Sequence, residues 1–466
     1  MSAPTVAHRP SLEQRALQAV DADELARMEQ LADWPQSDHR HVATTGADAL
    51  AEASSFAERF AERLTGFSEE ELEAAKEPHP HAFQHEECGL FPIGEVSVIA
   101  APGREGKTFA TIALAVSYVL GTKVVGLKPQ PDRCVLVYSA EDDRPQYARK
   151  VLARCSQLGQ EDAARVRARI VVPDLQVPGM EAFQTIVAVH ERAPVESFAV
   201  DAVIEALRSR MDDPVPPGLV VFETASTLSE AEEDNRSFKI LIRALRRIAR
   251  SLQVAVVLVH HTSQAASSNL PDLNLSVADI RGATALAYNS RQNLLLVNLG
   301  SAEEPFPDND ARSVLRSMVA PRAGGRVSAL VPLDSSKAID PPPVFFQWQG
   351  TPFGAALATV PVPPSLEGAR WRKLRQLMQG QRTEQRQAAK DDAQMAKVEE
   401  VVALVRDLCN AGKQATAKQV SIAAGRNNGW AAPYLQIAVR EGLLTVRDEP
   451  ILRAKGLFPV YRPVTG

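Results

Sequence analysis

The sequence holds few cysteines and no long apolar run. The 466 residues include four cysteines, Cys88, Cys134, Cys155 and Cys409, and no two of them form a C-x-x-C pair. Such wide spacing is typical of reduced thiols and argues against a disulfide framework or a zinc site. No apolar stretch approaches the roughly 20 residues of a membrane-spanning helix, and the N-terminal residues lack the apolar core of a signal peptide. We therefore expect a cytoplasmic protein without a membrane segment.

Positive charge is scarce in the first part of the chain. Residues 1–80 carry 7 Lys and Arg against 16 Asp and Glu, whereas residues 371–466 carry 16 against 9. The whole chain has a formal net charge of −5. A basic end on an otherwise acidic protein is typical of a nucleic-acid-binding appendage, and a solvated helical tail is the alternative.

The middle of the chain alternates between aliphatic runs and helical patterns. We predict strands at V-S-V-I-A, C-V-L-V-Y-S, L-V-V-F, V-A-V-V-L-V, L-L-L-V-N-L, V-L-R-S-M-V and V-S-A-L-V. A helix over 237–252 places Phe238, Leu241, Leu245 and Ile248 on one face. Nearly continuous aliphatic strands separated by helices predict an α/β fold with a mainly parallel sheet that is buried on both faces.

Changes in composition divide the chain into four segments. Residues 1–80 are predicted to form an acidic, helical and partly flexible segment, and residues 81–360 the α/β core. P-V-P-P opens a linker over 361–393 that contains a basic helix from Trp371 to Lys390. The last segment, 394–466, shows three helical patterns and two strand-like runs.

A glycine-containing loop follows the first predicted strand of the core. It matches G-x-x-x-x-G-K-[ST], except that Ala101 replaces the first glycine. Glycines let the backbone turn its N–H groups around phosphate oxygens, Lys107 then reaches the β- and γ-phosphates, and Thr108 coordinates Mg²⁺. The sequence therefore predicts a site for ATP and Mg²⁺. Its residues are Ala101, Pro102, Gly103, Arg104, Glu105, Gly106, Lys107, Thr108 and Phe109.

Polar residues end the neighbouring strands. Glu141, after C-V-L-V-Y-S, is the candidate for polarising the attacking water. The alternative for the acids of this turn is helix N-capping, which describes Asp142 or Asp143 better. Glu223 ends the strand L-V-V-F, where an acid that holds Mg²⁺ is expected, and a solvated strand-end acid is the alternative. His260 and His261 end V-A-V-V-L-V, next to the nucleotide strands, and we predict that this pair senses the γ-phosphate.

Together these motifs resemble a known family. G-L-F-P-I-G-E-V-S-V-I-A-A-P-G-R-E-G-K-T is similar to the opening segment of RecA-type ATPase cores. The order A-E-D-D, E-E-D-N-R-S-F-K, V-L-V-H-H-T-S, R-G-A-T-A-L-A-Y-N-S-R resembles the RepA-like replicative helicases of plasmids and phages, a branch of the RecA/DnaB superfamily of P-loop ATPases. The resemblance covers about Ala82 to Pro332. It implies hexameric rings with ATP between neighbours and single-stranded DNA through the centre.

The resemblance also implies roles for single residues. Arg291 matches the arginine that is supplied to a neighbour's γ-phosphate, with a structural cation at helix C-terminal carbonyls as the alternative, and Arg322 matches a second cation. Gln264 stands where a lysine often follows the paired histidines, and Glu223 stands where Asp is usual. The other implied roles are the Walker A pair for Lys107 and Thr108, the catalytic glutamate for Glu141, the Walker B acid for Glu223 and the sensor for His260 and His261.

The last segment resembles a winged helix-turn-helix. Thr416 is expected to cap its second helix, Gly425 to end that helix, and a third helix to run from about Ala431 to Glu441. The runs L-L-T-V-R-D and F-P-V-Y-R-P are predicted to pair as a hairpin. Such modules bind either duplex DNA or a protein, so both partners stay open.

The sequence thus favours an ATP-hydrolysing DNA motor, a ring-forming helicase of plasmid or phage type. Its expected cofactors are ATP and Mg²⁺, and its expected partners are DNA, further copies of the chain and a replication protein at the N-terminal segment. Two alternatives stay open. One is a DNA-binding ATPase that regulates or mediates recombination without unwinding, and the other is a nucleotide-binding scaffold with slow turnover because of Glu223.

Overall fold

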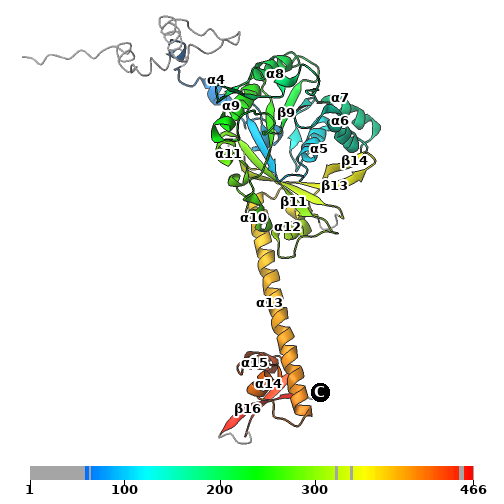
Figure 1. Ribbon diagram of the computed structural model, residues 1–466, viewed down its shortest axis with the longest axis vertical. Helices are drawn as coiled ribbons and strands as arrows, with labels where there is room; N and C mark the ends of the chain where they lie inside the picture. The colour runs from blue at the N-terminus through cyan, green and yellow to red at the C-terminus, as the bar shows by residue number, and fades with distance from the viewer. Residues whose placement is uncertain (1–57, 62–63, 321–323, 336–338, 451–455, 465–466) are drawn as a thin grey trace, which may run out of the picture. The chain divides into compact units, whose positions relative to one another are not determined.

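The computed structural model describes residues 58–61, 64–320, 324–335, 339–450 and 456–464 (Figure 1). Contacts divide the chain into two units, 1–77 and 78–466. In the first unit, the short helix α4 (Glu69–Ala74) begins at a capping box formed by Ser68 and Glu71. The rest of the predicted acidic N-terminal segment lies largely outside the described residues. Among the helices that the structure describes, none is long and apolar enough to cross a membrane.

The second unit is built on a nine-stranded sheet. Its strand order is β14-β13-β12-β11-β3-β10-β9-β5-β6, in which β11 through β6 are parallel to one another and β12, β13 and β14 extend the sheet in antiparallel fashion. The bounds are β3 (Val96–Ala101), β5 (Cys134–Ser139), β6 (Ile170–Val171), β9 (Pro217–Glu223), β10 (Ala255–His261), β11 (Gln292–Gly300), β12 (Val327–Ser335), β13 (Val344–Thr351) and β14 (Gly354–Thr359).

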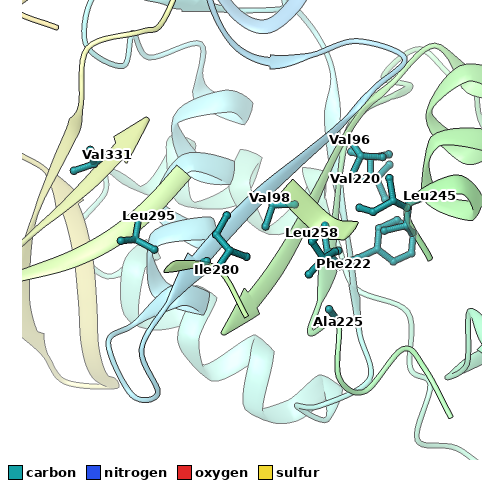
Figure 2. Packing of buried hydrophobic residues seen from close by; sticks show 14 of the residues in the cluster. Val96, Val98, Val220, Phe222, Ala225, Leu245, Leu258, Ile280, Leu295 and Val331 are labelled. Atoms are coloured by element: carbon teal, nitrogen blue, oxygen red, sulfur yellow. The ribbon is translucent and has the colours of Figure 1, made fainter. Parts of the chain in front are cut away.

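Helices cover both faces of this sheet, and each face has its own core. One core includes residues of α8 (Ala199–Arg208), α9 (Asn235–Leu252), α11 (Ala283–Asn289) and α12 (Ala311–Val319). The other includes residues of α5 (Lys107–Leu120), α6 (Arg144–Cys155) and α7 (Gln160–Arg169). Figure 2 shows the first core, in which α9 contributes Leu245 and the strands contribute Val96, Val98, Val220, Phe222, Leu258, Leu295 and Val331. The predicted α/β fold with a mainly parallel sheet buried on both faces is therefore confirmed.

Smaller elements complete the core. They are the antiparallel sheet of β2 (Cys88–Pro92), β1 (His81–His85) and β4 (Lys128–Pro129), the hairpin of β7 (Val187–His190) and β8 (Ala193–Glu196), helix α10 (Ala266–Asn269), and 3₁₀ turns at Glu181–Phe183, Leu270–Asp272, Val277–Asp279 and Pro364–Leu366.

One predicted strand is a helix. V-L-R-S-M-V lies in α12, which begins at the N-cap Asp310, whose carboxylate accepts a hydrogen bond from the N–H of Arg312 at 2.8 Å. The buried residues Ala311, Val314 and Leu315 have helical spacing, so the short aliphatic run fills a helix stripe. The prediction was wrong because a run of only six residues fits the periodicity of a helix as well as that of a strand. It also overlooked Asp310, which precedes the run and caps the helix.

A single helix, α13 (Trp371–Asn410), joins the predicted linker to the last segment. The first and last parts of this helix belong to two different cores: Trp371, Leu374 and Met378 pack in the core that contains α9, and Val398 to Val405 in a third core. The sequence predicts a helix ending near Lys390 and a separate helix beyond Gln394. No glycine or proline lies between these two positions, so nothing breaks the helix and it continues.

The third core holds the C-terminal elements. Helix α14 (Ala417–Ala423) is capped by Thr416, helix α15 (Ala432–Arg440) follows, and β15 (Leu444–Pro450) pairs with β16 (Leu457–Pro463) as an antiparallel hairpin. The predicted cap, third helix and hairpin are thus present, whereas the assignment as a winged helix stays a prediction.

We predict that a fragment of residues 394–466 folds alone, because its core of Val398, Val401, Leu435, Leu444 and Tyr461 draws on no other segment among the described residues. The fragment should unfold cooperatively on heating, followed by circular dichroism. Replacing the fully buried Leu435 with Ala should cost about 2–5 kcal/mol in the free energy of unfolding. A gradual melt without a transition would contradict an autonomous core.

Candidate functional site

The predicted phosphate loop joins the central strand β3 to α5. Gly106 is the N-cap of α5, with a left-handed φ of 86°. A Cβ atom at this position would lie 2.4 Å from Cζ2 of Trp348, so the position requires glycine on two grounds, conformation and space. The N–H groups of Gly106, Lys107 and Thr108 belong to the first helical turn and donate to no other described residue. They form an anion-binding helix end.

Side-chain alternation decides which strand residues reach this loop. Val257, Val259 and His261 of β10 point towards the face that α5 covers, and the residues between them point to the opposite face. The Nζ atom of Lys107 lies 3.3 Å from Nδ1 of His261 and 3.4 Å from the carbonyl oxygen of Pro102. An ammonium group can only donate, so Nδ1 of His261 accepts and the proton of the neutral ring is on Nε2.

His260 does not join the site. Its side chain is fully buried on the opposite face, where its ring packs edge-on against Phe238 of α9 at 5.3 Å between centroids. Burial, followed by the effects of His261 and Arg281, lowers its pKa to about 3, so the ring is neutral at physiological pH. Of the two predicted sensor residues, the structure brings only His261 to the phosphate loop.

Glu223 is buried beneath α5. Its side chain is 2% exposed and lies 2.9 Å from the hydroxyl of Thr111, which is also 2.9 Å from the carbonyl oxygen of Thr108. Burial raises the pKa of Glu223 to about 7, the hydrogen bond from Thr111 opposes that shift, and Asp142 and Glu141 add to it. Because a hydroxyl has one proton, Thr111 can serve both partners only when the carboxyl of Glu223 carries a proton of its own.

The three acids after β5 have different surroundings. Glu141 is exposed, and its Oε2 accepts a hydrogen bond from the hydroxyl of Thr224, the residue after Glu223, at 3.0 Å. Asp143 is the N-cap of α6 and accepts from the N–H of Gln146 at 2.7 Å, as the alternative interpretation of these acids predicted. Asp142 pairs with Lys150. Glu141 is therefore the acid of this turn that is hydrogen-bonded to the residue next to Glu223.

Arg291, one of the two predicted arginines, is not at the loop. The backbone N–H of Arg291 donates to Val96 at the start of β3, at 2.8 Å. Five residue steps of about 3.3 Å separate Val96 from Ala101, so Arg291 lies roughly 16 Å from the loop along this strand. The helix C-terminal carbonyl of Asn289 accepts instead from Arg246. Arg322 lies outside the described residues.

The antiparallel extension contributes residues that the sequence did not reveal. Arg326, just before β12, forms an ion pair with Glu105 of the loop, and its guanidinium lies 5.3 Å from the ring centroid of Trp348 on β13. The Trp348 ring in turn lies 5.1 Å from that of Phe109. The contacts of Arg326 with Glu105 and of Trp348 with Phe109 join positions more than 200 residues apart in the chain, so no local motif signals them.

The residues present fit a nucleotide with Mg²⁺. The helix end and Lys107 supply donors for phosphate oxygens, and Lys107, 8% exposed, has its pKa lowered by burial while Glu141, Glu223 and Glu105 oppose that effect. Thr108 and Glu223 would hold the metal on the face covered by α5. In the part of the chain that the structure describes, no group of three or more His, Cys, Asp or Glu side chains could hold a metal ion alone. A Mg²⁺ ion here would depend on the nucleotide's phosphates.

Comparisons with known proteins find a matching family model and a similar solved structure. The family model described as an AAA domain matches residues 60–267, which include the loop, Glu141, Glu223 and the two histidines. A solved structure titled "The Structure Of A DnaB-Like Replicative Helicase And Its Interactions With Primase" is 13% identical, with a TM-score of 0.41, and the match covers 74% of this chain and 76% of that chain. A TM-score this low does not by itself establish a shared fold. None of the curated proteins compared with the chain matches it.

We predict that burial of Glu223 makes the ligand-free protein less stable as pH rises. The pKa of Glu223 is raised from 4.5 to about 7 in the folded state. The contribution of the protonated carboxyl to the free energy of unfolding is therefore fully present below pH 4.5, decreases as the pH rises, and is lost above pH 7. Glu223→Gln keeps the shape without the charge. It should exceed wild type in unfolding free energy by an amount that grows from pH 5 to pH 8, reaching the order of a few kcal/mol.

Denaturant unfolding at several pH values measures this difference. The exposed acid Glu161 of α7 gives the matched control, Glu161→Gln, which as a surface substitution should change the unfolding free energy by no more than about 0.5 kcal/mol. A Glu223→Gln difference that does not vary with pH would contradict the raised pKa.

Proposed function

We propose that the protein is an ATP-hydrolysing motor that acts on DNA, a ring-forming helicase of the plasmid or phage replicative type. One observation carries the proposal: Lys107, His261 and Glu223 come from α5, β10 and β9, three elements far apart in sequence, and converge at one phosphate loop. The AAA domain match over 60–267 supports the nucleotide chemistry. The ring and the unwinding rest on the resemblance of the ordered motifs.

Each residue has a defined task in hydrolysis. Lys107 and the N–H groups of the first turn of α5 bind and orient phosphate oxygens, which lowers the cost of charge that develops there. A bound Mg²⁺ ion would supply further charge neutralisation, held by Thr108 and Glu223. Glu141, exposed and hydrogen-bonded to Thr224, is free to orient water, whereas the buried Glu223 is not. His261 senses the phosphates through its contact with Lys107.

Arg291 can take part only in trans. It lies at the end of β3 opposite the loop, so its guanidinium serves the nucleotide of a neighbouring subunit and not its own. Ring assembly therefore completes each site.

Positive charge next to the loop after β10 supports DNA binding by the core. The segment from Ser263 to Asn274 carries no cation of its own. Arg375 of α13 donates to Asn274 at 3.2 Å, and Arg382 pairs with Asp272 at 2.8 Å. Arg375 thus places a cation beside this loop, where Gln264 stands in place of a lysine, and offers it to the phosphates of a single strand, whereas the charge of Arg382 is paired with Asp272.

A scaffold with slow turnover is the second candidate, and the burial of Glu223 favours it. With a pKa of about 7, a large fraction of these carboxyl groups is protonated at neutral pH, which weakens metal binding. Tight ATP binding without turnover would support this candidate, and ATPase activity without strand displacement would support a regulator.

The main test of the proposal is complementation between two inactive variants. Lys107→Ala should lose several kcal/mol of transition-state stabilisation, and Arg291→Ala should bind ATP normally yet hydrolyse it about 10³-fold more slowly. Mixed, the two should recover activity, because some interfaces pair an intact loop with an intact arginine. The measurement is ATPase activity of mixtures over a range of ratios.

Arg208→Ala, which changes an exposed arginine of α8, is the control and should match wild type in every mixture. Absence of any gain in the mixture would refute the role of Arg291 in trans, and hydrolysis by Lys107→Ala at the wild-type rate would refute the nucleotide site itself.

The C-terminal elements should bind duplex DNA. A chain that lacks residues 394–466 keeps the part of α13 that packs on the core, so its ATPase activity should survive. Its affinity for duplex DNA should fall, and the dependence of that affinity on salt concentration should flatten because phosphate contacts are lost. Unchanged duplex affinity would assign these elements to a protein partner.

A further inference from the structure

A buried carboxylate stands at the beginning of the phosphate-loop strand. Glu95, the residue before β3, is 4% exposed. Its backbone is fixed on both sides, because its carbonyl oxygen accepts from the N–H of Val256 at 3.2 Å, and the N–H of Gly94 donates to Val254 at 2.9 Å. The carboxylate therefore has little freedom to move.

Three arginines contact this one carboxylate. Arg250 approaches Oε1 at 2.7 Å, Arg246 approaches Oε2 at 3.1 Å, and Arg291 approaches Oε2 at 3.6 Å. We name Glu95 with these three residues the Glu95 cluster. Burial raises the pKa of Glu95, but the hydrogen bond and charge of Arg250 and the charges of Arg246 and Arg291 outweigh it, so the pKa lies below its usual value. The carboxylate is ionised at neutral pH.

Two arginines of the Glu95 cluster reach solvent, since the side chains of Arg250 and Arg291 are 57% and 37% exposed. Arg246 is fixed by a second contact, because it also donates a hydrogen bond to the carbonyl oxygen of Asn289. Without the carboxylate the three cations would repel one another and separate.

We propose that Glu95 is a positioning residue for Arg291, and that it holds the guanidinium in the orientation that reaches a neighbouring subunit's nucleotide. The inference rests on the proposed function and deepens it. Glu95 touches no nucleotide. It acts through Arg291. Arg250 and Arg246 hold the carboxylate of Glu95 in place, so the guanidinium of Arg291 is ordered before the phosphates of the neighbouring subunit's nucleotide approach it.

The test replaces the carboxylate with an amide. Glu95→Gln should lower kcat for ATP roughly 10- to 100-fold and leave the affinity for ATP unchanged, because its own phosphate loop is intact. Glu95→Asp keeps the charge on a shorter side chain and should recover part of the loss. Glu196→Gln is the matched control: Glu196 pairs with Arg247 of the same helix α9, away from Arg291, and its loss should not change kcat.

Two mixtures separate action on the neighbour from action on the subunit's own site. If Glu95 positions Arg291, the Glu95→Gln variant has an intact phosphate loop and a wrongly oriented Arg291. It should then gain activity when mixed with Lys107→Ala and gain none when mixed with Arg291→Ala. If Glu95 instead supports its own loop through β3, the outcomes reverse: the mixture with Arg291→Ala gains activity, and the proposal is overturned.

The remaining outcomes are also decisive. Weaker ATP binding by Glu95→Gln, or no gain in either mixture, would overturn the positioning role. Failure of the proposed function has a different signature, since wild type would then not hydrolyse ATP, or Lys107→Ala and Arg291→Ala would not complement each other. A Glu95→Gln chain that does not fold would show in its melting curve, and Glu95→Asp mixed with Lys107→Ala then repeats the test.

Discussion

A sheet that is covered on both faces must send alternate side chains of each strand to two different cores, and the site depends on this constraint. The phosphate loop leads into α5, which covers one face of the sheet, so only strand residues whose side chains point to that face reach the loop. We call this alternation between the two faces the parity of a strand residue. Glu223 and His261 have this parity, whereas Phe222 and His260 have the other and pack against the helices of the opposite face. A shift of one residue in the register of β9 or β10 would exchange the acid for a phenylalanine or one histidine for the other.

The same parity explains what the sequence could and could not predict. Strands such as β3, β5, β9 and β10 are aliphatic throughout, so their existence and order were predictable. The face of the sheet to which each side chain points was not predictable, because a strand that is buried on both sides shows no alternation of polar and apolar residues. His260 therefore looked equivalent to His261. The run in α12 was too short to distinguish helix from strand, and α13 crosses the predicted segment boundary because nothing in its middle breaks a helix.

The contacts that Trp348 and Arg326 make with the phosphate loop could not be predicted from the sequence. Trp348 lies against Gly106, and Arg326 pairs with Glu105, although both come from the antiparallel extension, which showed only the aliphatic run of β12 as a signal. The extension places the Trp348 ring beside Gly106 and an arginine beside Glu105. Glu223 is buried separately, beneath α5, and this burial keeps its proton bound up to near neutral pH.

The extended strand β3 has a consequence for assembly. It begins at a cluster of arginines and ends at a phosphate loop, and being buried and rigid it keeps these two ends apart and oriented oppositely. The action of Arg291 in trans that we propose would bring the start of β3 in one copy to the phosphate loop of the next, which is a head-to-tail contact. Such heterologous contacts repeat until the rotation between copies closes a circle, or else continue as a helical filament. In this proposed assembly the rotation between successive copies, and not any residue of the active site, would decide which of the two forms.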